Sequence, residues 1–339
     1  GWSTSSYGRW SVTPPDVPRI ARAESPSAAF DRAAIQRLLQ GIGTELLFGG
    51  DPEAAVARLE SWGAPEAEAR RIVDTAIADP LLVNGREMAL MLRRRDWLLE
   101  SLEKLQQLSP RAKTIERRAD LSGSEFLEFY YARNRPVVIQ GEMTGWPAPS
   151  KWTLPFLREA AGLAPQGGGI VAAKDETAVE IAMDAAAFAP LAGDLGALEK
   201  FLDRETPPRA GAVRIAQEGA FVPLCSEPRN ALLAQIVGRT RLRLLAAADA
   251  AKVYGRDGVT SEIGDLEAPG RALSRFPLLA DVRIHDIVLE PGEILFVPMA
   301  WWHQLRALDF GVLARYVNFR WPNDMDRAFP RPPRSGGTA

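Results

Sequence analysis

The residue types that most often bind metals or take part in proton transfer are scarce in this sequence. The chain has 339 residues but only two histidines, His285 and His303, and one cysteine, Cys225. An imidazole can bind a metal or act as a base, and a thiolate can act as a nucleophile when a base lies beside it. No site with two imidazoles can form unless His285 joins His303. We expect His285 to be a structural or surface residue, which leaves His303 as the imidazole that could take part in chemistry.

His303 lies between two stretches with the pattern of β-strands. The sequence Glu-Pro-Gly-Glu at 290–293 is typical of a turn, because proline presets one backbone angle and glycine accepts the next. The apolar run 294–298 follows, and its length suits a buried strand better than a helix. A second apolar run begins at Gly311 and places Asn318 fifteen residues after His303. The rest of the chain is interpreted as a scaffold for this segment or as an attachment to it.

The run PGEILFVPMAWWHQLRALD, followed by NFRWPND, resembles the cupin-like, JmjC-type oxygenases. In that family the histidine that corresponds to His303 binds Fe(II). An asparagine at the position of Asn318 helps to hold the co-substrate 2-oxoglutarate. The resemblance extends from about Ile115 to Asp324. It implies an α+β fold in which a double-stranded β-helix, a jelly-roll or cupin-like JmjC barrel, follows an N-terminal α-helical domain.

The metal site of the resembled family needs two neutral imidazoles and one carboxylate, which leave positions open for 2-oxoglutarate and oxygen. Its first two ligands lie two residues apart on one strand, so both face the metal. The corresponding residues here are Cys225 and Glu227, with His303 as the third. Glutamate is an acceptable replacement for aspartate, but cysteine in place of histidine is a serious change. A thiolate suits Zn(II) or Cu(I) better than an Fe(II) site that activates oxygen.

The family's 2-oxoglutarate lysine lies fifteen residues after the first ligand, and Thr240 occupies that position here. Side chains alternate along a strand, so three nearby arginines are predicted to face away from the pocket if Thr240 faces it. They are Arg239, Arg241 and Arg243. A further asparagine of the family pattern is replaced by Ala231. Together with the cysteine at the first ligand position, these departures favour the loss of Fe(II) and 2-oxoglutarate binding.

The N-terminal third of the chain has helical periodicity and contains no histidine, no cysteine and no glycine-rich loop. We predict an irregular tail at 1–27 and a helical domain at 28–110, whose role is structural or dimer-forming. The barrel domain is predicted at 111–325, and a C-terminal tail at 326–339.

Within the helical domain the sequence predicts four helices. Gly41 and Gly43 are expected to end the first of them. The second opens at residues 51–53, where an aspartate in the capping position precedes a proline and a glutamate. The fourth is predicted from about Gly85 to Leu108 because its apolar residues keep a helical spacing.

Composition excludes several classes of protein. The sequence is 46% hydrophobic and 25% charged, with a formal charge of −2, so it has no basic surplus for binding nucleic acid or anionic lipid. No apolar run approaches the roughly eighteen residues that a membrane span needs, and no signal-like segment is present. One cysteine excludes an internal disulfide framework. We expect a globular, cytoplasmic protein without nucleic-acid or membrane partners.

Two functions compete at this point. The first is a pseudoenzyme that binds no cofactor and uses the retained pocket to bind a peptide, a small molecule or a paralogous protein. The second is a divergent oxygenase that uses Fe(II) and 2-oxoglutarate to hydroxylate a protein or peptide side chain. A Zn(II) site at Cys225, Glu227 and His303 stays open, and so does a nucleophilic Cys225 if the fold brings His303 to its thiol. The helical domain is a candidate surface for a homodimer.

Overall fold

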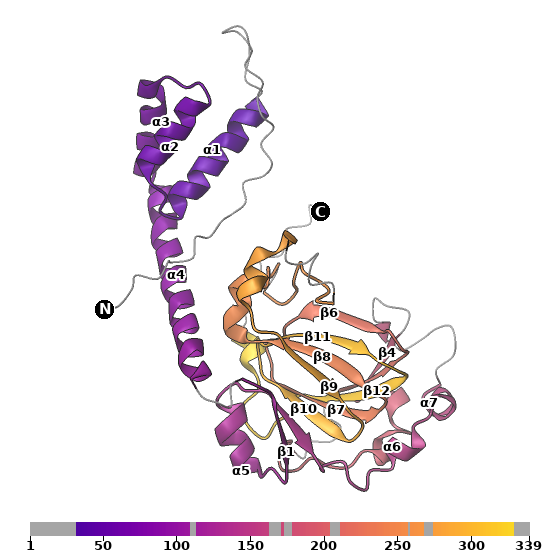
Figure 1. Ribbon diagram of the computed structural model, residues 1–339. Helices are drawn as coiled ribbons and strands as arrows, with labels where there is room; N and C mark the ends of the chain where they lie inside the picture. Colours follow the sequence, from indigo (N-terminus) through magenta and orange to yellow (C-terminus); the bar gives the residue numbers. More distant parts are fainter. Residues whose placement is uncertain are drawn as a thin grey trace. The chain divides into compact units, whose positions relative to one another are not determined.

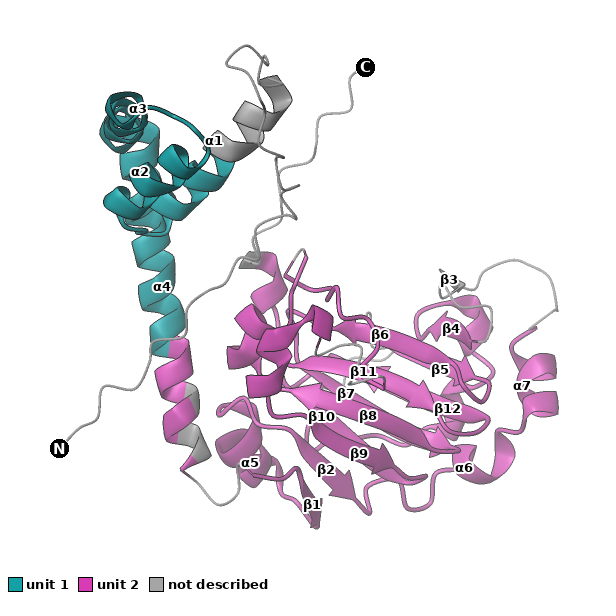
Figure 2. Ribbon diagram, turned by 45° about the horizontal axis from the view of Figure 1, so that its top comes forward, with its two compact units in different colours: residues 1–98 teal, residues 99–339 magenta. Residues whose placement is uncertain are grey.

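The computed structural model describes residues 32–108, 113–162, 171–172, 178–203, 211–256, 258–267 and 274–328. The chain divides into two compact units, Gly1–Leu98 and Leu99–Ala339 (Figure 2). The tail predicted at 1–27 lies outside the described residues, as does most of the tail predicted at 326–339. In the part of the chain that is described, no helix combines the length and the apolar character that a membrane span requires.

The first unit is built from helices, as predicted (Figure 1). They are α1 (Arg32–Leu47), α2 (Pro52–Ser61), α3 (Glu66–Ala78) and α4 (Pro80–Gln107), the last of which continues past the unit boundary. The side chain of Asp51 accepts a hydrogen bond from the N–H of Glu53, so the predicted cap at the start of α2 is present. Buried apolar side chains hold the first three helices together: Ile42, Leu46, Ala55, Val56, Leu59, Ala69 and Val73.

Two predicted helix boundaries are wrong. Helix α1 continues through Gly41 and Gly43, because Ile42 and Leu46 extend its buried face beyond them. Burial of two such side chains outweighs the roughly 1 kcal/mol that each glycine costs in a helix. Helix α4 begins at its proline, residue 80, because the first helical position needs no N–H, and the preceding aspartate accepts a hydrogen bond from the N–H of Leu81 at 2.7 Å.

The second unit contains two sheets. The larger has the strand order β1-β2-β10-β7-β12-β5-β4-β3, and the smaller has the order β6-β11-β8-β9. The strands of the larger sheet are β1 (Glu116–Ala119), β2 (Val137–Gln140), β3 (Val171–Ala172), β4 (Ala178–Ala182), β5 (Ala212–Ala216), β7 (Ala231–Val237), β10 (Glu293–Val297) and β12 (Gly311–Tyr316). Those of the smaller sheet are β6 (Phe221–Cys225), β8 (Thr240–Leu245), β9 (His285–Leu289) and β11 (Trp302–Ala307). Among these described strands only β1 and β2 pair in parallel, so the predicted double-stranded β-helix is confirmed.

Two apolar layers hold the barrel together. The layer between the sheets combines side chains from both, including Leu233 and Leu313 of the larger sheet and Leu242 of the smaller. The other face of the larger sheet is covered by α5 (Gly123–Phe126), α7 (Leu154–Ala160) and the segment 183–202 (Figure 1). Helix α5 begins with a capping box, in which Ser122 and Glu125 are bonded to each other's backbone N–H groups.

An aromatic contact at the centre of the outer layer supplies a test of this core. The ring of Phe126 lies 4.9 Å from the rings of Phe201 and Phe296, and its side chain is fully buried. Phe126→Ala is expected to lower the free energy of unfolding by roughly 3–5 kcal/mol, because it leaves a cavity. Denaturant titration measures the change. The control Ile284→Ala, at a half-exposed position, is expected to cost less than about 1 kcal/mol, and equal losses in both variants would contradict this account of the core.

Candidate functional site

Strand pairing brings Cys225 and His303 together. Cys225 is the last residue of β6 and lies directly opposite His303 on β11. The Sγ atom of Cys225 is 3.9 Å from Nε2 of His303 and 3.8 Å from its carbonyl oxygen. The register between the two strands shifts just after His303, where Leu305 pairs with Val222. This bulge lets both Val222 and Cys225 face the space between the sheets.

The environment of His303 favours a protonated ring. Its side chain is buried, and Nδ1 donates a hydrogen bond to the carbonyl oxygen of Trp301 at 3.1 Å, since a carbonyl only accepts. Burial alone lowers the pKa of His303. The hydrogen bond and charge of Cys225, followed by the charge of Glu227, act against burial and raise that pKa to about 9. A protonated imidazole has no lone pair to give to a metal.

Glu227 is bound by a cation of the same chain. One carboxylate oxygen of Glu227 accepts a hydrogen bond from Nη2 of Arg315 and forms an ion pair with it. Arg315 is on β12, whose odd-numbered side chains Leu313 and Arg315 share the side that faces the barrel interior. The guanidinium of Arg315 therefore lies beside the carboxylate of Glu227, which the family resemblance implies is a metal ligand.

The turn before β11 is held by residues from distant parts of the chain. The N–H of Met299 donates to Oδ1 of Asn230 at 2.8 Å, and its carbonyl accepts from Nδ2 of Asn134 at 3.0 Å. Ala300 has a φ of +62°, which is unusual for a residue with a Cβ, and its N–H donates to the carbonyl oxygen of Glu227 at 2.7 Å. These bonds fix the backbone on both sides of the site.

Thr240 faces the barrel interior, where there is little free space. It is buried at the start of β8 and lines a cavity of about 20 Å³. The other residues that line this cavity are Arg214, Ala216, Ala220, Val222, Leu305, Ala307, Gly311 and Leu313. The guanidinium of Arg214 is bound to Glu180 at 3.0 Å. A cavity of this size holds about one water molecule and is too small for a five-carbon dicarboxylate.

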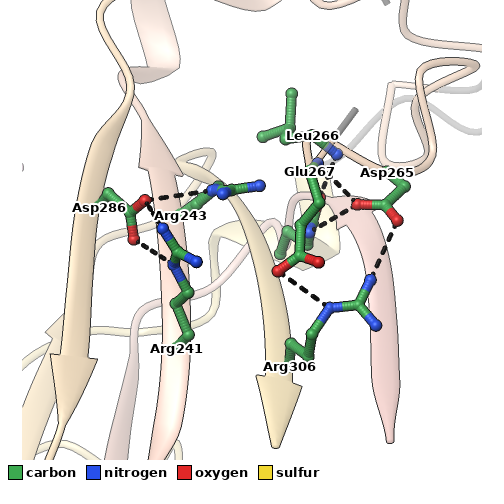
Figure 3. Close-up of polar contacts among 8 residues, drawn as sticks. Arg241, Arg243, Asp265, Leu266, Glu267, Asp286 and Arg306 are labelled. Atoms are coloured by element: carbon green, nitrogen blue, oxygen red, sulfur yellow. Dashed lines mark hydrogen bonds and ion pairs between the residues drawn. The ribbon is translucent and has the colours of Figure 1, made fainter. Parts of the chain in front are cut away.

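The three arginines near Thr240 are bound elsewhere. Arg241 donates twice to the carboxylate of Asp286, at 2.8 and 2.6 Å, and Arg243 donates to the same group at 3.3 Å (Figure 3). Arg239 is bound to Asp309 at 2.9 Å. The side chains of Arg241 and Arg243 lie on the face of β8 opposite its inward residues, so the predicted alternation is confirmed.

The structure does not bring Asn318 into this group of side chains. Strand β12 ends at Tyr316, and Asn318 lies beyond it, where Nδ2 donates to the carbonyl oxygen of Asp203 at 3.2 Å. It lines a separate cavity of about 760 Å³ with Tyr316 and side chains of the segment 183–203. The inward residue of the strand is Arg315, three positions earlier. The role expected for Asn318 at a co-substrate site stays a prediction, and in this structure the residue lies beyond the end of β12 and lines a different cavity.

The side chains around His303 do not fit the metal and co-substrate that the resemblance implies. Cys225 replaces an imidazole, Glu227 is paired with a guanidinium, and the remaining imidazole is protonated. Across the described ranges, no group of three His, Cys, Asp or Glu side chains is arranged to hold a metal ion.

His285 does not add an imidazole to the site. It lies on β9, at the far edge of the smaller sheet from β6, and its ring is 5.9 Å from that of Trp301. Burial lowers the pKa of His285, and the neighbouring charge of Arg283 adds to that effect. The prediction of a structural role agrees with this packing.

The pairing of Glu227 by Arg315 was not predicted from the sequence. The run GVLARY contains one charged residue among apolar ones, and that residue shares its strand face with Leu313. A lone charge on the inward face of a buried strand is the signal that could have identified it, because buried charges are almost always paired.

The raised pKa of His303 predicts a dependence of stability on pH. A group that is more basic in the folded state stabilises it fully below its unfolded pKa of 6.5, and this stabilisation is lost as the pH rises through about 9. The free energy of unfolding is expected to fall by about 3 kcal/mol over that interval. His303→Gln should remove this part of the pH dependence. Urea titrations of both proteins between pH 6 and 10 measure it, and identical slopes with pH would contradict the account.

Comparison with known proteins agrees with the observed fold. Residues 184–327 match the cupin-like domain family. Lysine-specific demethylase 8 of Xenopus tropicalis is 37% identical over 107 residues, which are 30% of this chain and 23% of that protein. Lysine-specific demethylase JMJ30 of Arabidopsis thaliana is 24% identical over 255 residues, which are 63% of this chain and 56% of that protein. The chain thus spans less than two thirds of the length of either relative.

Among solved structures, the ribosomal oxygenase YcfD of Escherichia coli is 19% identical, with a TM-score of 0.38 over 66% of this chain and 62% of that one. The cupin-like match covers strands β5 to β12 with the loops between them, and Cys225, Glu227, His303 and Arg315 all lie within it. The barrel domain of this chain is therefore similar to the cupin-like, JmjC-type proteins, with the cupin-like match at residues 184–327.

Proposed function

We propose that this chain is a catalytically silent member of the JmjC-type family whose barrel domain binds a peptide, a small molecule or a paralogous protein. The observation that carries the proposal is the ion pair between Glu227 and Arg315. In an active relative the carboxylate at this position would neutralise a divalent metal. Here a guanidinium supplies the positive charge, so the site is electrostatically complete without an ion.

The other ligand positions support the same proposal. Binding of Fe(II) would require the loss of the proton on His303, whose pKa is about 9, and the release of Arg315 from its carboxylate. Each step costs free energy, because a charge at the site would lose its partner. The remaining donor, the thiol of Cys225, favours softer metals than Fe(II).

The co-substrate position adds a second, independent argument. The distal carboxylate of 2-oxoglutarate would enter an interior cavity of about 20 Å³ next to Thr240, which carries no charge, and Arg214, whose guanidinium is already bound to Glu180. Leaving a buried carboxylate without its cation costs roughly 3–5 kcal/mol. That cost raises the dissociation constant by about two to three and a half powers of ten. A micromolar complex would then be too weak to form at physiological concentrations of the ligand.

A binding role does not need the metal position. The cavity beside Asn318 has a volume of about 760 Å³, which is within the range of small-molecule sites. Its walls come from the segment 183–203 and from Tyr316, and most of them are apolar. A small ligand or a peptide side chain bound there would contact the face of the larger sheet opposite to His303.

The proposal predicts weak or absent Fe(II) binding by the wild-type chain. Anaerobic titration with Fe(II) is expected to give no stoichiometric complex in the wild type, and none in Cys225→His, because Glu227 stays paired. The double variant Cys225→His/Arg315→Gln frees the carboxylate and is expected to bind one equivalent. Tight, stoichiometric iron in the wild type would overturn the proposal.

The proposal also predicts no useful binding of 2-oxoglutarate. Calorimetry on the wild type is expected to show no binding in the micromolar range, and no succinate should form when iron and oxygen are present. Thr240→Lys, combined with the double variant above, places a cation on the inward face and should restore detectable binding. The control is Arg241→Lys in the Cys225→His/Arg315→Gln background. The side chain at position 241 points to Asp286, so this variant should not restore binding of 2-oxoglutarate.

A dissociation constant in the low micromolar range for the wild type would instead favour the divergent oxygenase, which hydroxylates a protein or peptide side chain.

The distance of 3.9 Å between Sγ of Cys225 and Nε2 of His303 favours one further candidate, a nucleophilic cysteine with an adjacent base. Alkylation of Cys225, the only cysteine in the chain, separates this candidate from the others. An activated thiol reacts with iodoacetamide at pH 6 and loses that reactivity in His303→Gln, whereas an ordinary thiol reacts slowly in both proteins.

A further inference from the structure

Helix α4 carries an exposed apolar seam on the side opposite to the one that packs in its own unit. On the packed side Ala89 is buried and Leu82 is half-buried against the core of α1–α3. On the other side several apolar side chains are exposed, and those of the first compact unit that the seam uses are exposed over 49% to 82% of their surface: Leu81, Met88, Met91 and Leu98. Exposed apolar side chains that recur along this length of one helix side are costly in water, so they indicate a surface that is covered by a partner.

The spacing of this seam is that of a coiled coil. With Leu81 as the first core position of a heptad, the core positions that follow within the first compact unit are Asn84, Met88, Met91, Arg95 and Leu98. Successive members are three or four residues apart, which is the repeat that keeps one side of a helix against a second helix. The partner is therefore another helix with matching core positions, and a second copy of α4 provides them.

The polar members of the seam decide the direction of that second copy. Parallel copies would place Arg95 against Arg95 in the core, where two guanidinium groups repel each other, although each also lies 3.9 Å from the carboxylate of Asp96 in its own helix. Antiparallel copies related by a twofold axis beside residues 89–90 place Arg95 opposite Asn84, which can accept its hydrogen bonds. The same axis places Leu81 opposite Leu98, so the outer apolar layers are matched as well.

The flanking charges agree with the antiparallel arrangement. Glu87 and Arg94 lie on the same flank of the seam, two helical turns apart. Neither forms an ion pair within the described part of the chain. The twofold axis beside residues 89–90 places Glu87 of each copy next to Arg94 of the other copy. The dimer therefore contains two such pairs of opposite charges. In a parallel pair both charges would lie beside leucines, at positions 92 and 99 of the other copy.

From these observations we infer that α4 forms an antiparallel coiled-coil homodimer through the seam from Leu81 to Leu98. This interface lies within the first compact unit and does not depend on the chemistry of the barrel. It gives the helical domain a function as the element that joins two barrels into one molecule.

Sedimentation equilibrium of the full chain tests the interface. A dimer is expected, and Met91→Glu should raise its dissociation constant by roughly a hundredfold, because it places two carboxylates in the core. The control Leu90→Glu changes a neighbouring exposed leucine outside the seam and should alter the constant less than about threefold. A wild-type monomer at all concentrations, or equal effects of the two variants, would overturn the inference.

Charge exchange and cross-linking test the direction. Glu87→Arg or Arg94→Glu alone should weaken the dimer about tenfold, and the two together should restore it.

Oxidation of an equimolar mixture of Met88→Cys and Met91→Cys, each in a Cys225→Ser background, should yield a cross-linked heterodimer. Met88→Cys alone should stay uncross-linked. Efficient cross-linking of Met88→Cys to itself would demonstrate parallel helices and contradict the arrangement.

Discussion

The ion pair of Glu227 with Arg315 lies where the strands of the JmjC-type fold converge on the metal position. Beside it, the thiol of Cys225 and the imidazole of His303 are in contact and raise the basicity of the ring. The carboxylate of Glu227 therefore has a cationic partner from the same chain. A divalent ion would have to displace a guanidinium and a proton, and it would gain only one imidazole and one carboxylate in return. The electrostatics of the site thus favour a barrel that is stable without a metal.

The scaffold around this site is independent of its chemistry. The layer between the sheets and the layer beneath α5 are apolar, and both would pack equally well around a metal. The strained residue Ala300 is held by its neighbours' bonds to Asn134 and Asn230, neither of which contacts a ligand position through its side chain. Replacement of a metal ligand would therefore cost the fold little. Under the proposed function, this separation would allow the motif around His303 to persist in a chain whose ligand positions differ from the family pattern.

The sequence predicted the fold because periodicity and turn residues fix it. The alternation around Thr240 correctly placed Arg241 and Arg243 outside the barrel, since a strand has a strict period of two. Counting residues from His303 to Asn318 did not show that Asn318 lies beyond the end of β12, because a count ignores where the strand ends and which side each residue faces. The pairing of Arg315 with Glu227 joins residues 88 positions apart, and no local pattern encodes such a contact. The extension of α1 through two glycines depended on burial against α2 and α3, which a local propensity does not report.

The most direct test of the occupied site is a crystal structure of the wild-type chain grown with excess Mn(II), a redox-stable substitute for Fe(II), and 2-oxoglutarate. Data collected at the manganese absorption edge locate the metal without reference to the protein atoms. We predict no anomalous peak within bonding distance of Nε2 of His303, and a guanidinium of Arg315 that remains hydrogen-bonded to Glu227. A fully occupied manganese ion ligated by His303 and Glu227, with Arg315 turned away, would contradict the account.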